Sequence, residues 1–131
     1  MGRAMEFIIK RDIFLDGIQK TLGIVEKKTT MPILNNVLIR ADQNRIKIIA
    51  TDREIGLVAD YEAQIMKDGE ITLSARKLYE MIREIQGEMI HFQKNEQSVV
   101  TLMSQKDIYK IPGIPADDFP NVAVDEDVKL F

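Results

Sequence analysis

Two carboxylates, Asp52 and Glu54, are spaced so that their side chains would share one face of a strand. Such a pair can serve as general acid and base when the two groups lie in different environments inside a cleft. No nucleophile and no glycine-rich phosphate loop accompanies them. We therefore expect Asp52 to satisfy turn or backbone groups. A small α+β enzyme that uses Asp52, Glu54 and His91 is the less favoured alternative, and a substrate panel with these three residues mutated would test it.

Metal and disulfide chemistry have little support in the composition. His91 is the only histidine, and the chain has no cysteine. A usual zinc site needs more of these ligands, so we expect no metal and no cofactor. His91 is instead expected to be an exposed or hydrogen-bonded sheet residue. The lack of cysteine fits a reducing cytoplasm, and no apolar run is long enough for a membrane span.

Basic side chains are the second set that could do chemistry, because they can neutralise phosphates. The net charge of −3 argues against a globally basic nucleic-acid binder, but local fields decide which surface meets a polyanion. Six basic residues are expected on the outward faces of two helices: Lys10, Arg11, Lys20, Arg76, Lys77 and Arg83. Acidic residues are interspersed, so two ordinary solvated helix faces remain the alternative interpretation.

Two halves with the same rhythm must position these residues. In the first half, a strand at 6–10 precedes a helix with Asp12 as N-cap and Gly23 as stop signal. In the second half, a strand at 70–73 precedes a helix with Ser74 as N-cap and Gly87 as stop signal. Each half then continues with three predicted strands, at 37–41, 46–50 and 57–63 in the first and at 89–93, 98–103 and 108–111 in the second.

A shift of 64 positions superimposes the halves. It lays Phe7-Ile8-Ile9 on Ile71-Thr72-Leu73, and it lays Phe14 and Ile18 on Leu78 and Ile82. The repeat predicts an α+β fold of two β-α-β-β-β units, because a Rossmann sheet would need alternating strands and helices. Both helices must bury their apolar stripes, so we expect them side by side on antiparallel sheets with pseudo-twofold symmetry.

Four segments resemble the bacterial DNA polymerase III beta subunit, the sliding clamp family, in order and spacing. They are Met31-Pro32-Ile33-Leu34-Asn35-Asn36-Val37-Leu38, Thr51-Asp52-Arg53-Glu54-Ile55, Ser74-Ala75-Arg76-Lys77 and Asp117-Asp118-Phe119-Pro120-Asn121. The resemblance covers Met5 to Phe131. Ser74 stands where the family often has proline, and Arg53 stands where an apolar residue is frequent.

The resemblance implies a domain organisation, because family members are longer and have three similar domains per chain. Residues 5–127 are then the first clamp domain, and 128–131 are the opening strand of a truncated second domain. Residues 1–4 are predicted to be a cloning remnant or an alternative start, with Met5 as the natural first residue.

The function implied by the resemblance is non-catalytic. Two chains form a head-to-tail ring around double-stranded DNA, with helices lining the hole and contacts that carry no sequence information. The ring tethers the replicative polymerase in the cytoplasm, and the polymerase and clamp loader bind later domains. No membrane partner is implied. A protein-interaction module of clamp-like fold without a DNA role is the second alternative, which mixing with duplex DNA at low salt would test.

Particular residues follow from the resemblance as well. Lys27 and Lys28 match a loop that touches phosphates, and a solubilising loop is the alternative. Arg76 is equally suited to DNA contact and to a structural ion pair. The ring dimer interface would involve Lys77, Lys106, Tyr109 and Ile111. Tyr109 and Ile111 lie on a predicted edge strand, whose backbone groups are open to a partner while one face of its side chains packs into the core.

Overall fold

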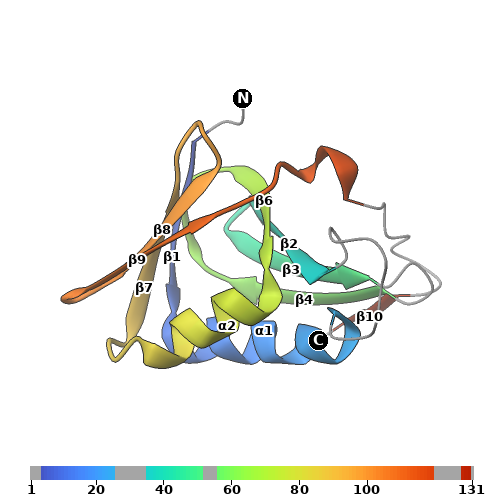
Figure 1. The fold of residues 1–131 in the computed structure, drawn as a ribbon, viewed down its shortest axis with the longest axis horizontal. Coiled ribbons are helices and arrows are strands. Elements are labelled where there is room, and N and C mark those ends of the chain that lie inside the picture. The colour runs from blue at the N-terminus through green and yellow to red at the C-terminus, as the bar shows by residue number, and fades with distance from the viewer. Residues whose placement is uncertain (1–3, 26–34, 52–55, 120–127, 131) are drawn as a thin grey trace.

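A computed structural model describes residues 4–25, 35–51, 56–119 and 128–130 of the chain. Two helices lie side by side along one side of two sheets (Figure 1). The elements in chain order are β1 (Met5–Lys10), α1 (Arg11–Val25), β2 (Asn36–Asp42), β3 (Arg45–Thr51), β4 (Gly56–Glu62), β5 (Gln64–Lys67), β6 (Gly69–Ser74), α2 (Ala75–Glu84), β7 (Met89–Lys94), β8 (Val99–Ser104), β9 (Asp107–Pro112), the 3-10 turn η2 (Ala116–Asp118) and β10 (Val128–Leu130).

The two halves exchange their first strands. The first sheet has the order β5-β1-β7-β8-β9, and the second has the order β10-β4-β3-β2-β6. β1 therefore pairs with β7 of the second half, and β6 pairs with β2 of the first half. The pairs between these strands are antiparallel, except that β10 runs parallel to β4. The predicted α+β class with two helices on antiparallel sheets is confirmed.

The 64-residue repeat holds for the strand and helix that open each half. Both bounds of β6 (Gly69–Ser74) lie 64 residues after those of β1 (Met5–Lys10). Phe14 and Ile18 of α1 are fully buried, and so are their counterparts Leu78 and Ile82 of α2. The offset then falls to 53 residues between the starts of β2 and β7, because both the helix and the connection that follows it are longer in the first half.

Three phenylalanines join the halves in the core. The rings of Phe7 on β1 and Phe92 on β7 stack with 4.4 Å between centroids. Phe14 of α1 meets both rings edge-on, at 6.1 and 6.2 Å. All three side chains are fully buried. Alternation in the strands and helical spacing in α1 bring them to one place, and the cluster fastens the exchanged β1 to its new sheet.

Three helix boundaries differ from the sequence prediction. α1 begins at Arg11, so Asp12 lies in its first turn and is not the N-cap. α1 also continues past Gly23 to Val25, because Val25 is buried and its burial offsets a glycine penalty of about 1 kcal/mol. α2 ends at Glu84 and not at Gly87, because Ile85 turns to extended backbone to reach the core.

Other local predictions are confirmed or extended. Ser74 caps α2 as predicted, with its Oγ accepting a hydrogen bond from the Lys77 backbone N–H at 3.3 Å. The short strand β5 is an addition that the sequence prediction lacked. A second apolar cluster covers the outer face of the second sheet, where Phe119 packs on Leu38, Ile49 and Val58. This packing explains the aromatic residue in the acidic-Phe-Pro segment.

Candidate nucleic-acid interface

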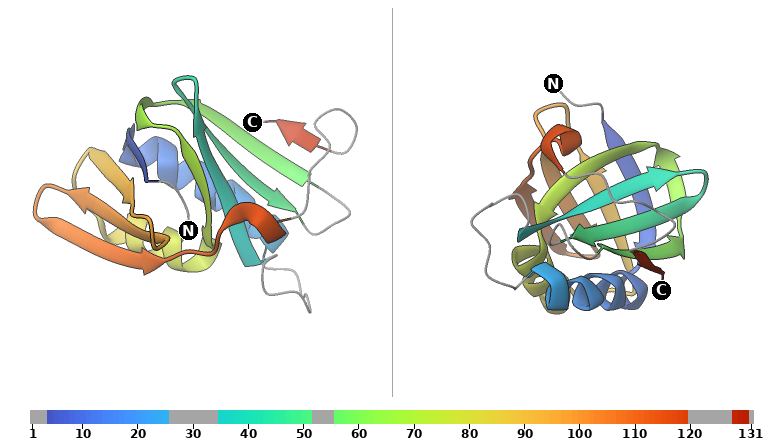
Figure 2. Two further views of the ribbon diagram at one scale, coloured as in Figure 1. Left: turned by 90° about the horizontal axis from the view of Figure 1, so that it is seen from above. Right: turned by 90° about the vertical axis from the view of Figure 1, so that its right-hand side faces the viewer.

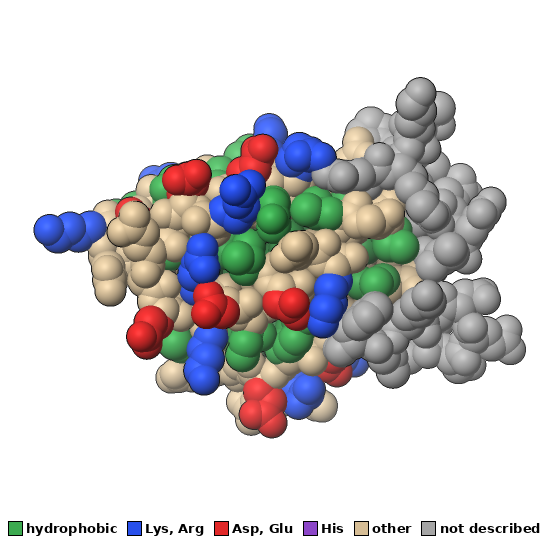
Figure 3. All heavy atoms as spheres, turned by 90° about the horizontal axis from the view of Figure 1, so that it is seen from below, with side chains coloured by type: hydrophobic (Ala, Val, Ile, Leu, Met, Phe, Trp, Pro, Cys, Tyr) green, Lys and Arg blue, Asp and Glu red, His purple; other side chains and the backbone are tan. Residues whose placement is uncertain are grey.

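The exposed side chains of α1 and α2 form one face of the molecule, the helix face. Both helices lie together on this side, and the sheets lie behind them (Figure 2). Seen directly, basic and acidic groups alternate across the face with apolar and neutral side chains between them (Figure 3). The sequences of the two helices contain five basic residues and four acidic ones, namely Arg11, Lys20, Arg76, Lys77 and Arg83 against Asp12, Asp16, Glu80 and Glu84. The described part of this face therefore carries little excess positive charge.

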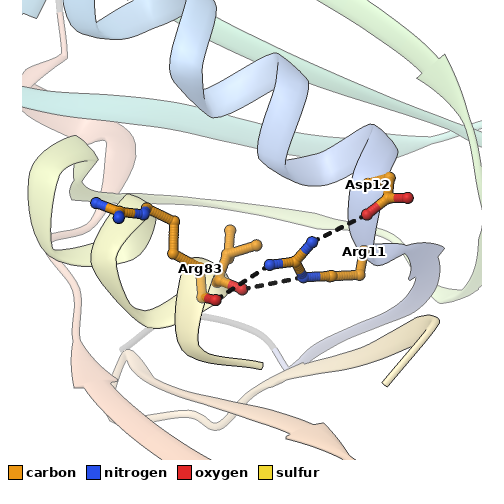
Figure 4. Close-up of polar contacts among 4 residues, drawn as sticks. Arg11, Asp12 and Arg83 are labelled. Carbon is orange, nitrogen blue, oxygen red and sulfur yellow. Dashed lines mark hydrogen bonds and ion pairs between the residues drawn. The ribbon is translucent and has the colours of Figure 1, made fainter. Parts of the chain in front are cut away.

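Arg11 joins the start of α1 to the end of α2. Its guanidinium group donates hydrogen bonds to the backbone carbonyls of Ile82 at 3.3 Å and Arg83 at 3.1 Å, and it pairs with Asp12 at 3.0 Å (Figure 4). The Arg11 side chain is only 24% exposed. Carbonyls in the last turn of a helix lack the usual amide donors four residues later, and Arg11 supplies a side-chain donor to two of them in α2. The Ile82 carbonyl also accepts a hydrogen bond from the Ile85 backbone N–H at 3.2 Å. The structure thus gives this predicted DNA contact a structural role, and a phosphate contact by Arg11 stays a prediction.

Lys20 is also engaged within the protein. Its Nζ lies 2.9 Å from an Asp16 carboxylate oxygen, one helical turn away, and the Tyr61 hydroxyl donates a hydrogen bond to the same carboxylate at 3.1 Å. The Lys20 ammonium and then the Tyr61 hydroxyl hold the pKa of Asp16 below its usual value. The same contact with Asp16 raises the pKa of Lys20. A phosphate would have to compete with Asp16 for this lysine.

The remaining predicted DNA contacts are spread along the helix side. Lys10 is exposed at the end of β1, where α1 begins. Arg83 is exposed with its guanidinium 5.4 Å from the centre of the Tyr79 ring. Arg76 borders a hollow of 410 Å³ that Val25, Asn35 and Ser74 also line. Lys27 and Lys28 lie outside the described residues, so their assignment remains untested.

The predicted ring interface lies on β9, at the edge of the first sheet. β9 pairs with β8 and with no other described strand, so the predicted free edge is confirmed. Ile111 is 1% exposed and belongs to the core, against which Tyr109 is partly buried. Lys106 in the β8–β9 turn and Lys77 on α2 are exposed. The structure thus bears out core packing for Ile111 and Tyr109, while the dimer role of all four residues stays a prediction.

His91 is satisfied within the first sheet, as expected. Its Nε2 lies within hydrogen-bond distance of the Glu6 carboxylate, to which the Gln93 side chain also donates at 3.1 Å. The hydrogen bond from Gln93 has the larger effect and the bond with His91 the next, and together they lower the pKa of the Glu6 carboxyl below its usual value. Asp52 and Glu54, the other members of the enzyme alternative, lie outside the described residues. Within the described ranges, no three His, Cys, Asp or Glu side chains are grouped as metal ligands.

Neither described helix is long and apolar enough to cross a bilayer.

Sequence reasoning missed two exposed residues at the edge of the first sheet, Ile108 and Lys110 on β9. The turn between β8 and β9 sets which residues of β9 face outward, and this signal was present in the sequence.

Comparison with known proteins identifies the family. Residues 5–123 match the model of the DNA polymerase III beta subunit, N-terminal domain. The beta sliding clamp of Pseudomonas aeruginosa is 29% identical over 90% of this chain and 32% of its own length, and that of Caulobacter vibrioides is 30% identical over 92% and 33%. This chain thus spans about a third of these relatives.

Solved structures agree with the sequence relatives. The Caulobacter crescentus beta sliding clamp superimposes with a TM-score of 0.88 at 28% identity, covering 95% of this chain and 34% of that one. The Pseudomonas aeruginosa DNA polymerase III subunit beta gives 0.83 at 30% identity, with 91% and 32% covered. With the fold, the repeat and the matched residues in agreement, the chain belongs to the family of the DNA polymerase III beta subunit, the bacterial sliding clamp, and corresponds to its N-terminal domain.

Proposed function

We propose that this chain is the first domain of a sliding clamp that encircles double-stranded DNA and tethers a replicative polymerase. Two full-length chains would close a head-to-tail ring, with the helix face toward the duplex. The clamp holds DNA by topology and catalyses nothing itself. Polymerase and clamp loader would bind domains that follow this one, and the protein would act in the cytoplasm.

One observation carries this proposal: both helices of a clamp-family domain lie on the same side of the two sheets (Figure 2). The exchange of β1 and β6 between the halves puts each helix after a strand of a different sheet, yet the helices contact each other. A repeat of this kind places two adjacent helices on one side of the domain, where both can face the backbone of the same DNA duplex.

The balance of charge on the helix face supports sliding. Arg11 and Lys20 are engaged with protein groups, and acidic residues stand beside the basic ones. Phosphate contacts are therefore few and weak, and they carry no base-sequence information. A ring that encloses the duplex needs no tighter grip, because topological linkage prevents dissociation.

Topology provides the decisive experiment. The full-length protein is loaded by its clamp loader onto a nicked circular plasmid and isolated by gel filtration. Cutting the plasmid once should release the protein, while an uncut circle retains it. Retention on the linear product would contradict enclosure, and failure to remain on the circle would contradict the clamp proposal as a whole.

The isolated domain provides a second test. We expect duplex DNA binding without sequence preference and with a Kd on the order of 10⁻⁴ M or weaker at physiological salt. Each neutralised phosphate should steepen the logarithmic salt dependence by about 0.9. Replacing Lys27 and Lys28 with glutamate should abolish binding at low salt, while Lys47→Glu on the outer face of the second sheet should not. Tight binding or a base preference would show that the helix face is not a sliding surface.

A further inference from the structure

Lys94 is a charged residue at a core position. Side chains alternate along β7, so Ile90, Phe92 and Lys94 all turn to the inner face of the first sheet, where the first two are fully buried. Lys94 itself is only 5% exposed. Its cross-strand neighbours, Met5 on β1 and Val100 on β8, are buried apolar residues. Lysine is rarely buried this far without a partner.

No partner of this kind is present for Lys94 among the described residues. Its ammonium group makes neither an ion pair nor a hydrogen bond with them. The nearby carboxylate of Glu70 on β6 is already bound to Arg40 at 3.0 Å. Burial lowers the pKa of Lys94, and the charge of Glu70 opposes this shift only in part. At neutral pH, Lys94 is therefore more often a neutral, nucleophilic amine than an exposed lysine is.

The amine of Lys94 nevertheless reaches water. Within the described ranges, every side-chain nitrogen or oxygen that is sealed from solvent has a hydrogen-bond partner. Lys94 has none, so its Nζ is not sealed, and the burial of the residue is that of its aliphatic stem. β7 ends here at the side of the molecule away from the helices, near the start of β1 (Figure 1). A small reagent can therefore meet the amine from solvent.

A hollow of 190 Å³ borders this end of β7, and Lys94 lines it together with Glu6, Lys67 and Asn95. Lys67 has no ion pair with a described residue. The Oδ1 of Asn95 accepts two backbone N–H bonds at 2.9 Å, which leaves its NH₂ group to donate. The Glu6 carboxylate is occupied by two side chains of β7. The hollow therefore offers a cation and an amide donor to a small anion.

We propose that Lys94 is a site of acylation at Nζ, and that the donor is a small acyl phosphate bound in this hollow. Lys67 and Asn95 hold the phosphate of the donor. The neutral amine attacks the acyl carbon, and a C–N bond forms as the C–O bond to phosphate breaks. Inorganic phosphate leaves with the electron pair of that bond, and the nitrogen releases one proton to water. The amide product is uncharged, so the reaction removes a charge from a core position.

Reaction of the 131-residue chain with acetyl phosphate at neutral pH tests the site, with acetylation of each lysine followed by peptide mass spectrometry. Lys94 should react about threefold faster or more than Lys10, Lys47 and Lys106, although these three are exposed. In urea, where the chain is unfolded, this advantage should disappear. A Lys94 that reacts more slowly in the folded chain than in urea would overturn the proposal, because burial would then protect the amine.

Matched variants test whether the hollow binds the donor. Lys67→Ala should slow the acetylation of Lys94 by acetyl phosphate about threefold or more, because the phosphate loses its cation, and Lys67→Arg should retain the rate. Acetylation of the exposed Lys47 should be the same in all three proteins. An uncharged acetyl ester of N-hydroxysuccinimide should modify Lys94 equally in the wild type and in Lys67→Ala. Equal rates with acetyl phosphate as well would overturn the assignment of the hollow as the donor site.

The buried charge provides a readout that needs no acyl donor. Lys94→Met keeps an unbranched side chain without the charge, so it should raise the urea midpoint at neutral pH, while Lys47→Met at an exposed position should not. The folded pKa of Lys94 is lowered, so the unfolded chain binds more protons between the two pKa values, and wild-type stability rises with pH there. The advantage of Lys94→Met should therefore shrink as the pH rises toward the usual lysine pKa of 10.5. An advantage that stays constant with pH, or a lower midpoint than the wild type at neutral pH, would contradict a buried charge at Lys94 and overturn the proposal.

Discussion

The helix face and the free edge of β9 treat their polar groups in opposite ways. On the helix face, Arg11 bonds to the end of α2, and Lys20 pairs with Asp16. On β9, the backbone groups of Ile108 and Lys110 and the ammonium of Lys106 have no described partner. One surface has satisfied much of its bonding capacity internally, and the other retains it.

This difference matches the two kinds of contact in the proposed clamp. A surface that must move along DNA benefits from weak, interchangeable phosphate contacts, since each strong contact would have to break at every step. A surface that must keep a ring closed benefits from directional bonds and apolar burial, which slow dissociation. The distinction can be tested by substitutions that compare a residue bonded within the protein with an exposed residue on the same element. The first should affect folding, and the second should affect binding.

The largest expected effect separates the two faces of β9. Ile111→Ala should lower the free energy of unfolding of the 131-residue chain by about 2–5 kcal/mol, because Ile111 is 1% exposed and its truncation leaves a cavity. Ile108→Ala should change it by about 0.5 kcal/mol or less. Urea unfolding measures both. Equal effects would mean that the strand has no distinct inner and outer face.

Arg11 tests whether the helix face is occupied by structural bonds. Arg11→Ala should lower the free energy of unfolding by about 1–3 kcal/mol, because the Arg83 carbonyl loses its Arg11 donor and the Ile82 carbonyl keeps only the Ile85 N–H. Arg11→Lys should recover only part of this loss, since lysine lacks the planar fork. Lys10→Ala, one residue earlier and exposed, is the matched control. A loss of DNA binding in Arg11→Ala without a loss of stability would assign Arg11 to the interface.

The pH dependence of the free energy of unfolding tests the hydrogen bonds around Glu6 on the outer face of the first sheet. The pKa of Glu6 is lowered by hydrogen bonds from Gln93 and His91, so its contribution is present above the usual carboxyl pKa of 4.5 and is lost as the pH falls through the lower folded value. Glu6→Gln should cost about 1 kcal/mol at neutral pH. The stability gap between the variant and the wild type should narrow as the pH drops below 4.5.

A constant gap between pH 7 and pH 3 in urea titrations would contradict this assignment. The same titration of His91→Gln keeps a possible donor to Glu6 but removes the imidazole. It should retain more of the pH dependence than Glu6→Gln, which abolishes the carboxyl group.

The smallest expected effect belongs to the exposed pair on α1. Lys20→Ala should leave the free energy of unfolding almost unchanged, because a solvent-screened pair one helical turn apart is weak. It should also reduce the low-salt DNA binding of the isolated domain only slightly. A large loss of binding would show that Lys20 leaves Asp16 to reach a phosphate, and the helix face would then be less occupied than the structure indicates.

Sequence patterns predicted the elements better than their boundaries. The stripe of Phe14 and Ile18 and its counterpart of Leu78 and Ile82 arise from helical spacing, so they could be recognised from the chain alone. The end of α1 could not, because burial of Val25 against distant strands outweighs Gly23. The end of α2 likewise depends on the core position of Ile85.

The prediction of the site failed mainly where a residue's hydrogen-bond partners lie far away in the sequence. Arg11 was assigned to the helix face by its position, yet its acceptors lie 71 and 72 residues away, and no local pattern reports them. The outward residues of β9 were different. The two-residue turn at Gln105 and Lys106 together with Pro112 would have fixed the bonding alternation, so Ile108 and Lys110 were within reach of the sequence.

The exchange of first strands also affects how the chain can fold while it is being synthesised. β1 leaves the ribosome early, but its partner β7 ends at Lys94, which lies opposite Met5. At about 5–20 residues per second, the nascent chain carries β1 without that neighbour for several seconds or longer. Phe7 and Ile9 therefore remain without their final packing throughout this interval. Chaperone binding to a stalled chain should fall once translation has passed β7, which makes the order of folding observable on the ribosome itself.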